Sequence, residues 1–164
     1  MATDWVQWRR EVFGDPYLVW HEGADFAELR RRVGTEPEVV TAWISAGLRE
    51  RDAVAAQAVA ESGLPDLPGL LKQQMIDASG VFAVRGAQAL FRLTGDAAWV
   101  RPVVEVLIGA DHWGDRLDAA IALAEFPATP FVVASVALAT ADEDELVRHH
   151  ATETLEKLRR KSRG

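Results

Sequence analysis

The chain has 164 residues, with 25 acidic against 18 basic side chains and no cysteine. A hydrophobic content of 49% with 26% charged residues excludes an intrinsically disordered chain, and the absence of cysteine excludes a disulfide-rich secreted scaffold. No apolar run approaches the ~18 residues that a membrane helix needs, and no signal peptide is visible at the N-terminus. We therefore expect one soluble, cytoplasmic domain over residues 1–164, without membrane association.

The composition favours helices. The chain contains 27 alanines, no asparagine, and 15 arginines against three lysines, a bias typical of a GC-rich, bacterial coding sequence. Alanine is the strongest helix former because it loses no side-chain entropy when a helix forms. Strand signals are nearly absent, so the prediction is an all-α protein.

Residues 1–34 form an aromatic N-terminal segment. Asp4 is placed to cap a helix over Trp5–Phe13, and Asp25 to begin a second helix over Phe26–Val33. An aromatic segment of this kind suits an N-terminal helical cap over the end of a repeat array, and it equally suits a dimer contact. A monomer or a weak dimer is therefore expected.

The segment that follows contains several helix start signals. Thr35-Glu36-Pro37-Glu38 reads as a capping box, in which Thr35 and Glu38 satisfy free backbone amides and Pro37 stands where no donor is needed. Similar starts at Asp66, Asp96 and Thr129 open three further segments. The predicted helices lie at about residues 36–48, 66–78, 96–109 and 129–141.

A second set of helices repeats at near-constant spacing. Four nine-residue segments align without gaps, and their last residues are separated by 31, 33 and 32 residues. Small residues occupy two aligned columns, and an aliphatic residue follows in a third. The segments are Arg51–Val59, Phe82–Leu90, Asp115–Leu123 and Val147–Leu155. Small residues three apart allow a second helix to approach closely, so the predicted unit is a helical hairpin of about 32 residues, repeated four times.

The pattern resembles the HEAT-like family of α-solenoids, including the short PBS-lyase HEAT-like repeats. Asp115–Leu123 and Val147–Leu155 look like the family's Val-Arg-x-x-Ala-x-x-Ala-Leu signature, whereas Asp52 and Ala83 replace the arginine in the first two repeats. Pro102 resembles the family's kink proline. The resemblance implies a right-handed α-solenoid of about four HEAT-like hairpins over residues 35–158, and it implies little about function.

Sequence motifs for catalysis or metal binding are lacking. No HExxH motif, glycine-rich phosphate loop, GxSxG elbow or cysteine pair occurs. His149 and Glu153 share one helix face, but a third metal ligand is not evident. We predict no metal, no cofactor and no catalytic residues.

The candidate partner-binding residues cluster around His112-Trp113-Gly114-Asp115-Arg116, a turn that enters a second helix. Tryptophan and arginine are enriched in binding hot spots. A structural interpretation is also open, in which Asp115 caps the helix, Trp113 packs as a hydrophobic staple and Arg116 pairs with a neighbour. Aligned polar positions on the other second helices complete the candidate set, which is Trp113, Asp115, Arg116, Arg148, His149 and Arg92.

The favoured function is a non-catalytic protein-interaction module that binds a partner protein on its concave face, as an adaptor, a regulator or an immunity-type inhibitor. The resemblance implies that second helices line this face, where the aligned charges are of mixed sign. A net charge of −7 favours a basic partner and makes nucleic acid an unlikely one. One alternative is a HEAT-like DNA glycosylase that uses Asp115 beside Trp113, and another is a small-molecule or tetrapyrrole binder.

Residues 159–164 form a basic tail. Its cations complement the dipole of a C-terminal helix, and a nucleic-acid contact is the alternative interpretation. Without the five cations of residues 157–163 the net charge of the chain falls to about −12, which argues against a DNA-binding surface elsewhere.

Overall fold

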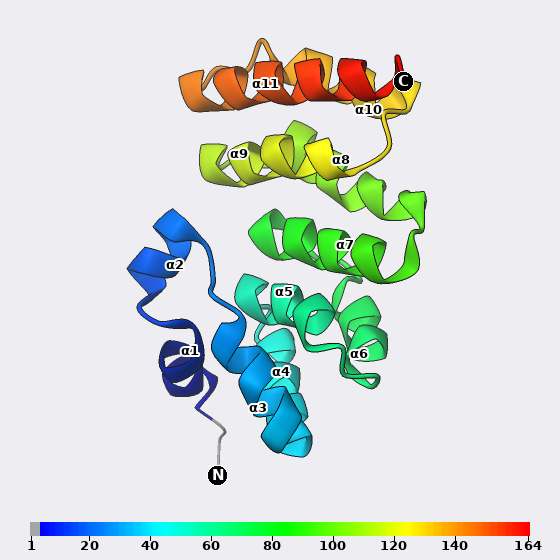
Figure 1. Cartoon of the computed structure of the whole chain (residues 1–164). Coiled ribbons are helices and arrows are strands. Elements are labelled where there is room, and N and C mark those ends of the chain that lie inside the picture. Colours follow the sequence, from blue (N-terminus) through cyan, green and yellow to red (C-terminus); the bar gives the residue numbers. More distant parts are fainter. Residues whose placement is uncertain (1–3) are drawn as a thin grey trace. The chain divides into compact units, whose positions relative to one another are not determined.

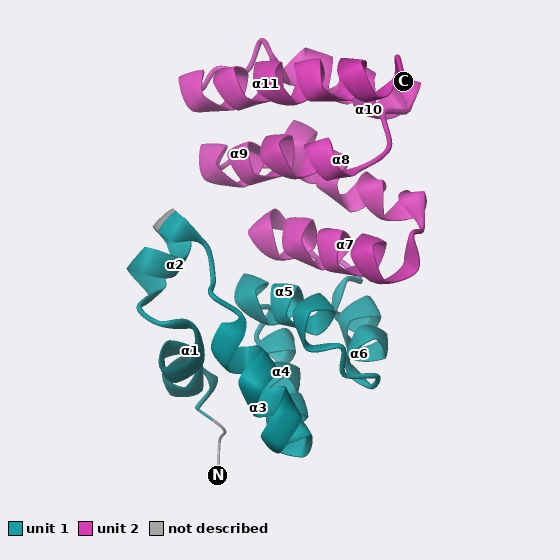
Figure 2. Cartoon of the chain, in the orientation of Figure 1, with its two compact units in different colours: residues 1–76 teal, residues 77–164 magenta. Residues whose placement is uncertain are grey.

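The computed structural model describes residues 4–164, and every regular element within them is helical, which confirms the all-α prediction. Residues 1–3, where the predicted N-terminal cap begins, lie outside the described residues. The chain separates into two compact units, Met1–Ile76 and Asp77–Gly164 (Figure 2). The boundary falls between the two helices of the second predicted hairpin.

Unit 1 contains the N-terminal segment and the first predicted hairpin. Its helices are α1 (Trp5–Phe13), α2 (Pro16–Glu22), α3 (Ala27–Thr35), α4 (Pro37–Arg49), α5 (Ala53–Ser62) and α6 (Leu67–Gln74). Helix α1 has the predicted bounds, and the carboxylate of Asp4 accepts the backbone N–H of Gln7 at 3.2 Å. Helix α2 was not predicted, because its seven residues are too few to show a helical apolar period. Its start signals were present, since Asp15 caps the helix and Pro16 is its first residue.

The aromatic face of α1 packs onto α3 and α4. Trp5 and Trp8 are buried, and the ring of Trp8 stacks on that of Trp43 with centroids 5.7 Å apart. Gly47 makes room for this packing, since a Cβ atom there would lie 2.6 Å from the ring of Trp5. Within unit 1, α1 therefore packs on α4, and α3 packs on both α4 and α5.

The predicted capping box at Thr35 is wrong. Helix α3 continues through Thr35, whose hydroxyl lies 3.3 Å from the carbonyl oxygen of Arg32. Glu36 then occupies the N-cap of α4 and makes no side-chain capping bond, while Pro37 takes the first helical position as predicted. A threonine hydroxyl that bonds back to its own helix is no longer available to cap the next one.

Unit 2 contains the remaining helices, which are α7 (Gly80–Thr94), α8 (Val100–Gly109), α9 (Trp113–Ala122), α10 (Pro130–Ala139) and α11 (Glu145–Lys161). Short 3-10 turns, η1 (Ala97–Trp99) and η2 (Leu123–Glu125), precede α8 and follow α9. Helix α9 packs against both α7 and α11, and Figure 1 shows these three helices as successive layers of the unit. Helices α8 and α10 pack on each other and on the α7, α9 and α11 layer.

The aligned columns of the repeat are buried in all four second helices. The small residues of both columns and the aliphatic residue that follows lie in the interiors of their units. The first column is Ala55, Gly86, Ala119 and Ala151, the second is Ala58, Ala89, Ala122 and Thr154, and the third is Val59, Leu90, Leu123 and Leu155. Small side chains at these positions let neighbouring helices pack closely.

Candidate functional site

The six predicted partner-binding residues lie in two places in unit 2. Trp113, Asp115 and Arg116 occupy the first turn of α9, and Arg148 and His149 occupy the first turns of α11. Since α9 and α11 pack against each other, these five residues belong to one region near the α8–α9 and α10–α11 loops. Arg92 lies apart from them, in the last turn of α7.

Arg116 is buried, with only 7% of its surface exposed. All five N–H groups of its guanidinium are engaged within the protein. Nε and Nη2 donate to Asp142 at 2.9 and 3.0 Å, and Nη2 also reaches Glu143 at 3.3 Å. Nη1 donates to the carbonyl oxygens of Ala110 and Asp111 at 2.9 and 3.0 Å.

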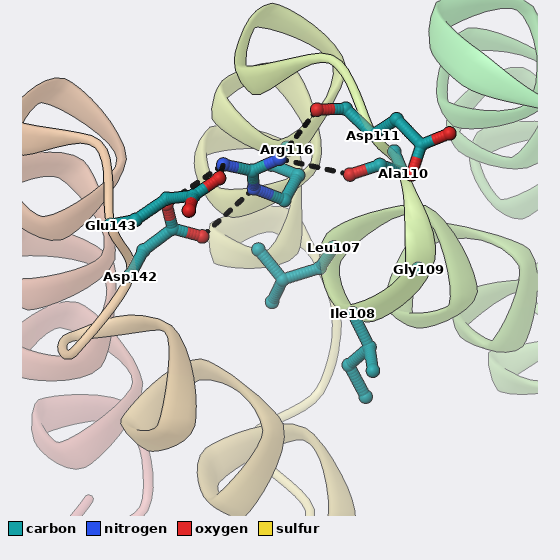
Figure 3. A pocket seen from close by; sticks show the side chains of 8 residues that line it. All are labelled: Leu107, Ile108, Gly109, Ala110, Asp111, Arg116, Asp142 and Glu143. Atoms are coloured by element: carbon teal, nitrogen blue, oxygen red, sulfur yellow. Dashed lines mark hydrogen bonds and ion pairs between the residues drawn. The ribbon is translucent and has the colours of Figure 1, made fainter.

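This network ties the α10–α11 loop to the α8–α9 loop, as Figure 3 shows. The hydrogen bonds from Arg116 lower the pKa of Asp142, and Asp142 in turn raises the pKa of Arg116. Because no donor of Arg116 remains for a ligand, the expectation that this side chain faces a partner is corrected. The structural alternative, a buried ion pair with a neighbour, is the arrangement observed.

Arg148 repeats part of this arrangement one hairpin later. Its Nη1 donates to the carbonyl oxygens of Asp142 and Glu143 at 2.7 and 2.9 Å, which are the residues six and five positions before it. Arg116 likewise donates to the carbonyl oxygens six and five positions before it. In both helices this arginine therefore forms hydrogen bonds with the loop that precedes its own helix. Arg148 is half-buried, and its backbone contacts are accordingly also structural.

Two ion pairs join charged residues at equivalent positions of neighbouring second helices. Arg85 of α7 donates to Asp118 of α9 at 3.0 Å, and Arg92 Nε donates to Glu125 of η2 at 2.9 Å. Both pairs join residues 33 positions apart, which is the repeat spacing at this point. The buried Gln88 donates to Glu125 as well, at 2.7 Å. In these two pairs, charges of opposite sign at equivalent repeat positions neutralise one another between α7 and the α9–η2 segment.

For Asp118 of the first pair, burial changes the pKa more than the neighbouring Arg85 does. It raises the pKa of Asp118, while the nearby Arg85 lowers that pKa by less. The Arg92–Glu125 pair is more exposed, and exposed pairs of this kind contribute about 0–1 kcal/mol. The Arg92–Glu125 pair therefore adds little to the free energy of unfolding.

His112, rather than Asp115, caps α9. Its Nδ1 accepts the backbone N–H of Gly114 at 3.0 Å, and Trp113 stacks on its ring with centroids 5.7 Å apart. The prediction that Asp115 caps this helix is therefore wrong. The carboxylate of Asp115 points from α9 to the N-terminus of α7, where one of its oxygens is 3.1 Å from the position of a Cβ on Gly80. A carboxylate there is favoured by the helix dipole.

Asp115 also lines a hollow of about 480 Å³ between two loops of unit 2. Glu105 and Asp111 line the same hollow together with Ser79 and His112. On the other side of the α8–α9 loop a second hollow, of about 400 Å³, is bounded by Asp111, Asp142 and Glu143. Carboxylates therefore dominate the loop edge of unit 2.

His149 is exposed on α11, and its Nε2 lies 3.6 Å from a carboxylate oxygen of Glu153. His150 approaches the same carboxylate at 3.2 Å. No group of three or more potential metal ligands occurs among the side chains that the structure describes, those of residues 4–20 and 22–164. In the same residues, no helix combines the length and the apolar character that crossing a membrane requires.

Comparison with protein-family models, with curated proteins and with solved structures gave no match. The site is therefore defined by its geometry. Its main feature that sequence reasoning missed is Asp142, the partner of Arg116. The neighbouring Asp144 begins α11 by accepting the N–H groups of Leu146 and Val147. Asp142 follows Arg116 by 26 residues, six short of a 32-residue repeat, so the repeat spacing does not point to this pair.

Proposed function

We propose that the chain is a HEAT-like α-solenoid and a non-catalytic protein-interaction module, and that its α7, α9 and α11 layer is the concave face that binds a partner. The observation that carries this proposal is the cross-layer pairing of Arg85 with Asp118 and of Arg92 with Glu125. Side chains at equivalent repeat positions meet from helix to helix, which is what a stacked repeat array requires.

The same pairing favours binding over catalysis. Charged side chains that hold each other are poorly suited to general acid–base chemistry, which needs titratable groups exposed to a substrate. Between the paired rows, α9 and α11 present Ile121, His149 and Glu153 to solvent. This mixture of polar and apolar side chains is compatible with a non-obligate protein interface, which is about as apolar as the rest of a protein surface.

An affinity isolation from native lysate at low salt, with recovered proteins and nucleic acids both identified, tests the proposal. We expect one protein in stoichiometric amount. Its recovery should be lost with Ile121→Glu and His149→Glu, two exposed positions whose substitution leaves the fold intact. Leu138→Glu on α10, also exposed but outside this layer, is the matched control. Recovery of nucleic acid or of a coloured ligand in place of a protein would contradict the proposal.

A further inference from the structure

The N-terminus of α9 is capped by an imidazole. Helix caps are most often serine, threonine, aspartate or asparagine, whose side-chain oxygen accepts a backbone N–H and does not titrate near neutral pH. At α9 the acceptor is Nδ1 of His112, which lies 3.0 Å from the backbone nitrogen of Gly114. A ring nitrogen accepts a hydrogen bond only while it carries no proton. This cap therefore requires the neutral form of His112, with the proton on Nε2.

Gly114 allows the imidazole to lie over the backbone amide that it caps. A Cβ atom on Gly114 would lie 2.9 Å from both Cε1 and Nδ1 of His112, so a larger residue would push the ring out of the cap. Trp113, which is 37% exposed, stacks on the same ring at an interplanar angle of 23°. The position of the His112 ring therefore determines both the first hydrogen bond of α9 and the surface on which Trp113 packs.

The hollow of about 480 Å³ beside the cap offers partners to the protonated ring. His112 lines this hollow together with three carboxylates, which belong to Glu105 of α8, Asp111 of the α8–α9 loop and Asp115 of α9. None of these three carboxylates forms an ion pair with another side chain among those that the structure describes. An imidazolium that leaves the cap would therefore meet negative charge that is not already neutralised.

The other surroundings of His112 hold the loop backbone in place. The N-terminus of α7 lines the hollow without an ionisable side chain, and the carboxylate of Asp115 lies against it. Arg116 is bound to the carbonyl oxygens of Ala110 and Asp111, and Figure 3 shows the carboxylate of Asp111 pointing away from the guanidinium. A change in the charge of His112 therefore acts on its side chain and on the first turn of α9, and not on the anchored loop.

We propose that the first turn of α9 is a pH-sensitive switch. When His112 is neutral, it caps α9 through Gly114. As the pH falls through the range in which an imidazole takes up a proton, ordinarily near about 6.5, a proton from solvent binds Nδ1 and the hydrogen bond to Gly114 breaks. The ring then turns into the hollow toward Glu105 and Asp111, and Trp113 loses its stacking partner. The stabilisation of α9 by this cap is present above the transition and lost below it.

This switch goes beyond the function proposed above and does not rest on it. It lies in one loop and one helix turn of unit 2, and it operates in the free chain. A partner that contacts Trp113 would bind the two states differently.

NMR spectra of the full chain labelled with ¹⁵N, recorded between about pH 5 and 8, test the inference. At the upper limit we expect Nδ1 of His112 to be unprotonated and Nε2 to carry the proton. As the pH falls, the amide proton of Gly114 should move upfield, the direction of a lost hydrogen bond. The indole N–H of Trp113 should shift with the same midpoint as the imidazole of His112.

Two variants fix the two states of the switch. His112→Asn supplies a cap that does not titrate, so the amide of Gly114 should no longer respond to pH. Gly114→Ala displaces the imidazole from the cap at every pH, so the indole resonance of Trp113 should already have its acid position at about pH 8.

His149→Asn is the matched control, because His149 is an exposed histidine 3.6 Å from the carboxylate of Glu153, on α11. It should leave the response of Gly114 unchanged. Glu105→Gln combined with Asp111→Asn should move the transition to lower pH, because the protonated ring loses two carboxylates. The inference would be overturned if Nδ1 of His112 carried the proton at the upper pH limit. An amide of Gly114 that does not respond to pH, or that responds equally in His112→Asn, would also overturn it.

Discussion

At the scale of single residues, two arginines at equivalent repeat positions have unequal roles. Arg116 donates to two carbonyl oxygens and to the buried carboxylate of Asp142, whereas Arg148 is seen to donate to two carbonyl oxygens only. The sequence aligns the two residues but cannot distinguish them. The difference depends on whether the loop of a following hairpin brings a carboxylate to the guanidinium.

The first prediction follows from this inequality. Arg116→Ala should destabilise the protein by about 3–5 kcal/mol, because it leaves the carboxylate of Asp142 buried without its partner. Arg148→Ala, the matched control, should cost no more than about 1.5 kcal/mol, since it removes hydrogen bonds from a half-exposed site. Urea unfolding followed by circular dichroism measures both. An equal loss of unfolding free energy in the two variants would show that the Arg116–Asp142 ion pair stabilises the protein no more than the hydrogen bonds of Arg148 do.

The second prediction concerns the stability of the protein at acidic pH. Hydrogen bonds from Arg116 hold the pKa of Asp142 below its unfolded value of about 3.9. The resulting stabilisation is complete above that unfolded pKa and is lost as the pH falls through the lower folded-state pKa. Asp142→Asn should therefore be less stable than the wild type at pH 7, and the difference should shrink below about pH 4.

The free energy of unfolding of both proteins, measured across this pH range, checks the prediction. Glu28, whose pKa is lowered to about 2 by hydrogen bonds from Arg31 and Arg32, titrates in both proteins and cancels in the comparison. A difference between wild type and Asp142→Asn that stays constant down to pH 2 would contradict the assigned role of Asp142.

At the scale of helices, most elements could be predicted from local signals. Helix α1 was predicted with its bounds and its cap, and Thr129 caps α10 as expected, by accepting the N–H of Val132. The errors occur where a side chain had more than one possible partner. Thr35 bonds back to α3, and His112 caps α9 in place of Asp115. Such choices depend on three-dimensional neighbours that a linear pattern does not contain.

The third prediction tests how α1 packs on α4. Gly47→Ala should destabilise unit 1 by about 1–3 kcal/mol, because the new methyl group would lie 2.6 Å from the rigid ring of Trp5. Gly69→Ala in α6 is the control, since nothing lies within 4 Å of its Cβ position. It should be neutral or stabilise by up to about 1 kcal/mol through helix propensity. Thermal unfolding of the two variants measures the difference between their stabilities. Equal stabilities would show that α1 does not pack on Gly47.

The fourth prediction concerns the cross-layer pairs. A double-mutant cycle on Arg92 and Glu125 should give a coupling energy of about 0.2–1 kcal/mol, because both side chains are partly exposed. The same cycle on Arg116 and Asp142 should give a clearly larger value, since that pair is buried. A larger coupling energy for Arg92 and Glu125 than for Arg116 and Asp142 would contradict this prediction.

At the scale of the whole molecule, the repeat was the most informative feature of the sequence. Its three aligned columns are buried in every second helix, so the spacing of small residues predicted which helix faces pack. Two features of this scale were not predictable from the pattern. The compact units divide the second predicted hairpin between α6 and α7, and α10 leaves Phe131 and Leu138 exposed to solvent. Hydrophobic periodicity reports which residues are apolar, not which of them a neighbour covers.

Equilibrium titration of the recovered partner protein against the purified chain tests the central claim, that the α7, α9 and α11 layer binds a protein, most directly. We predict a saturable complex with the wild type and binding weakened about tenfold or more by Ile121→Glu, with unchanged circular dichroism and melting. Leu138→Glu should bind this partner as the wild type does. Wild-type affinity in Ile121→Glu together with His149→Glu would contradict the claim.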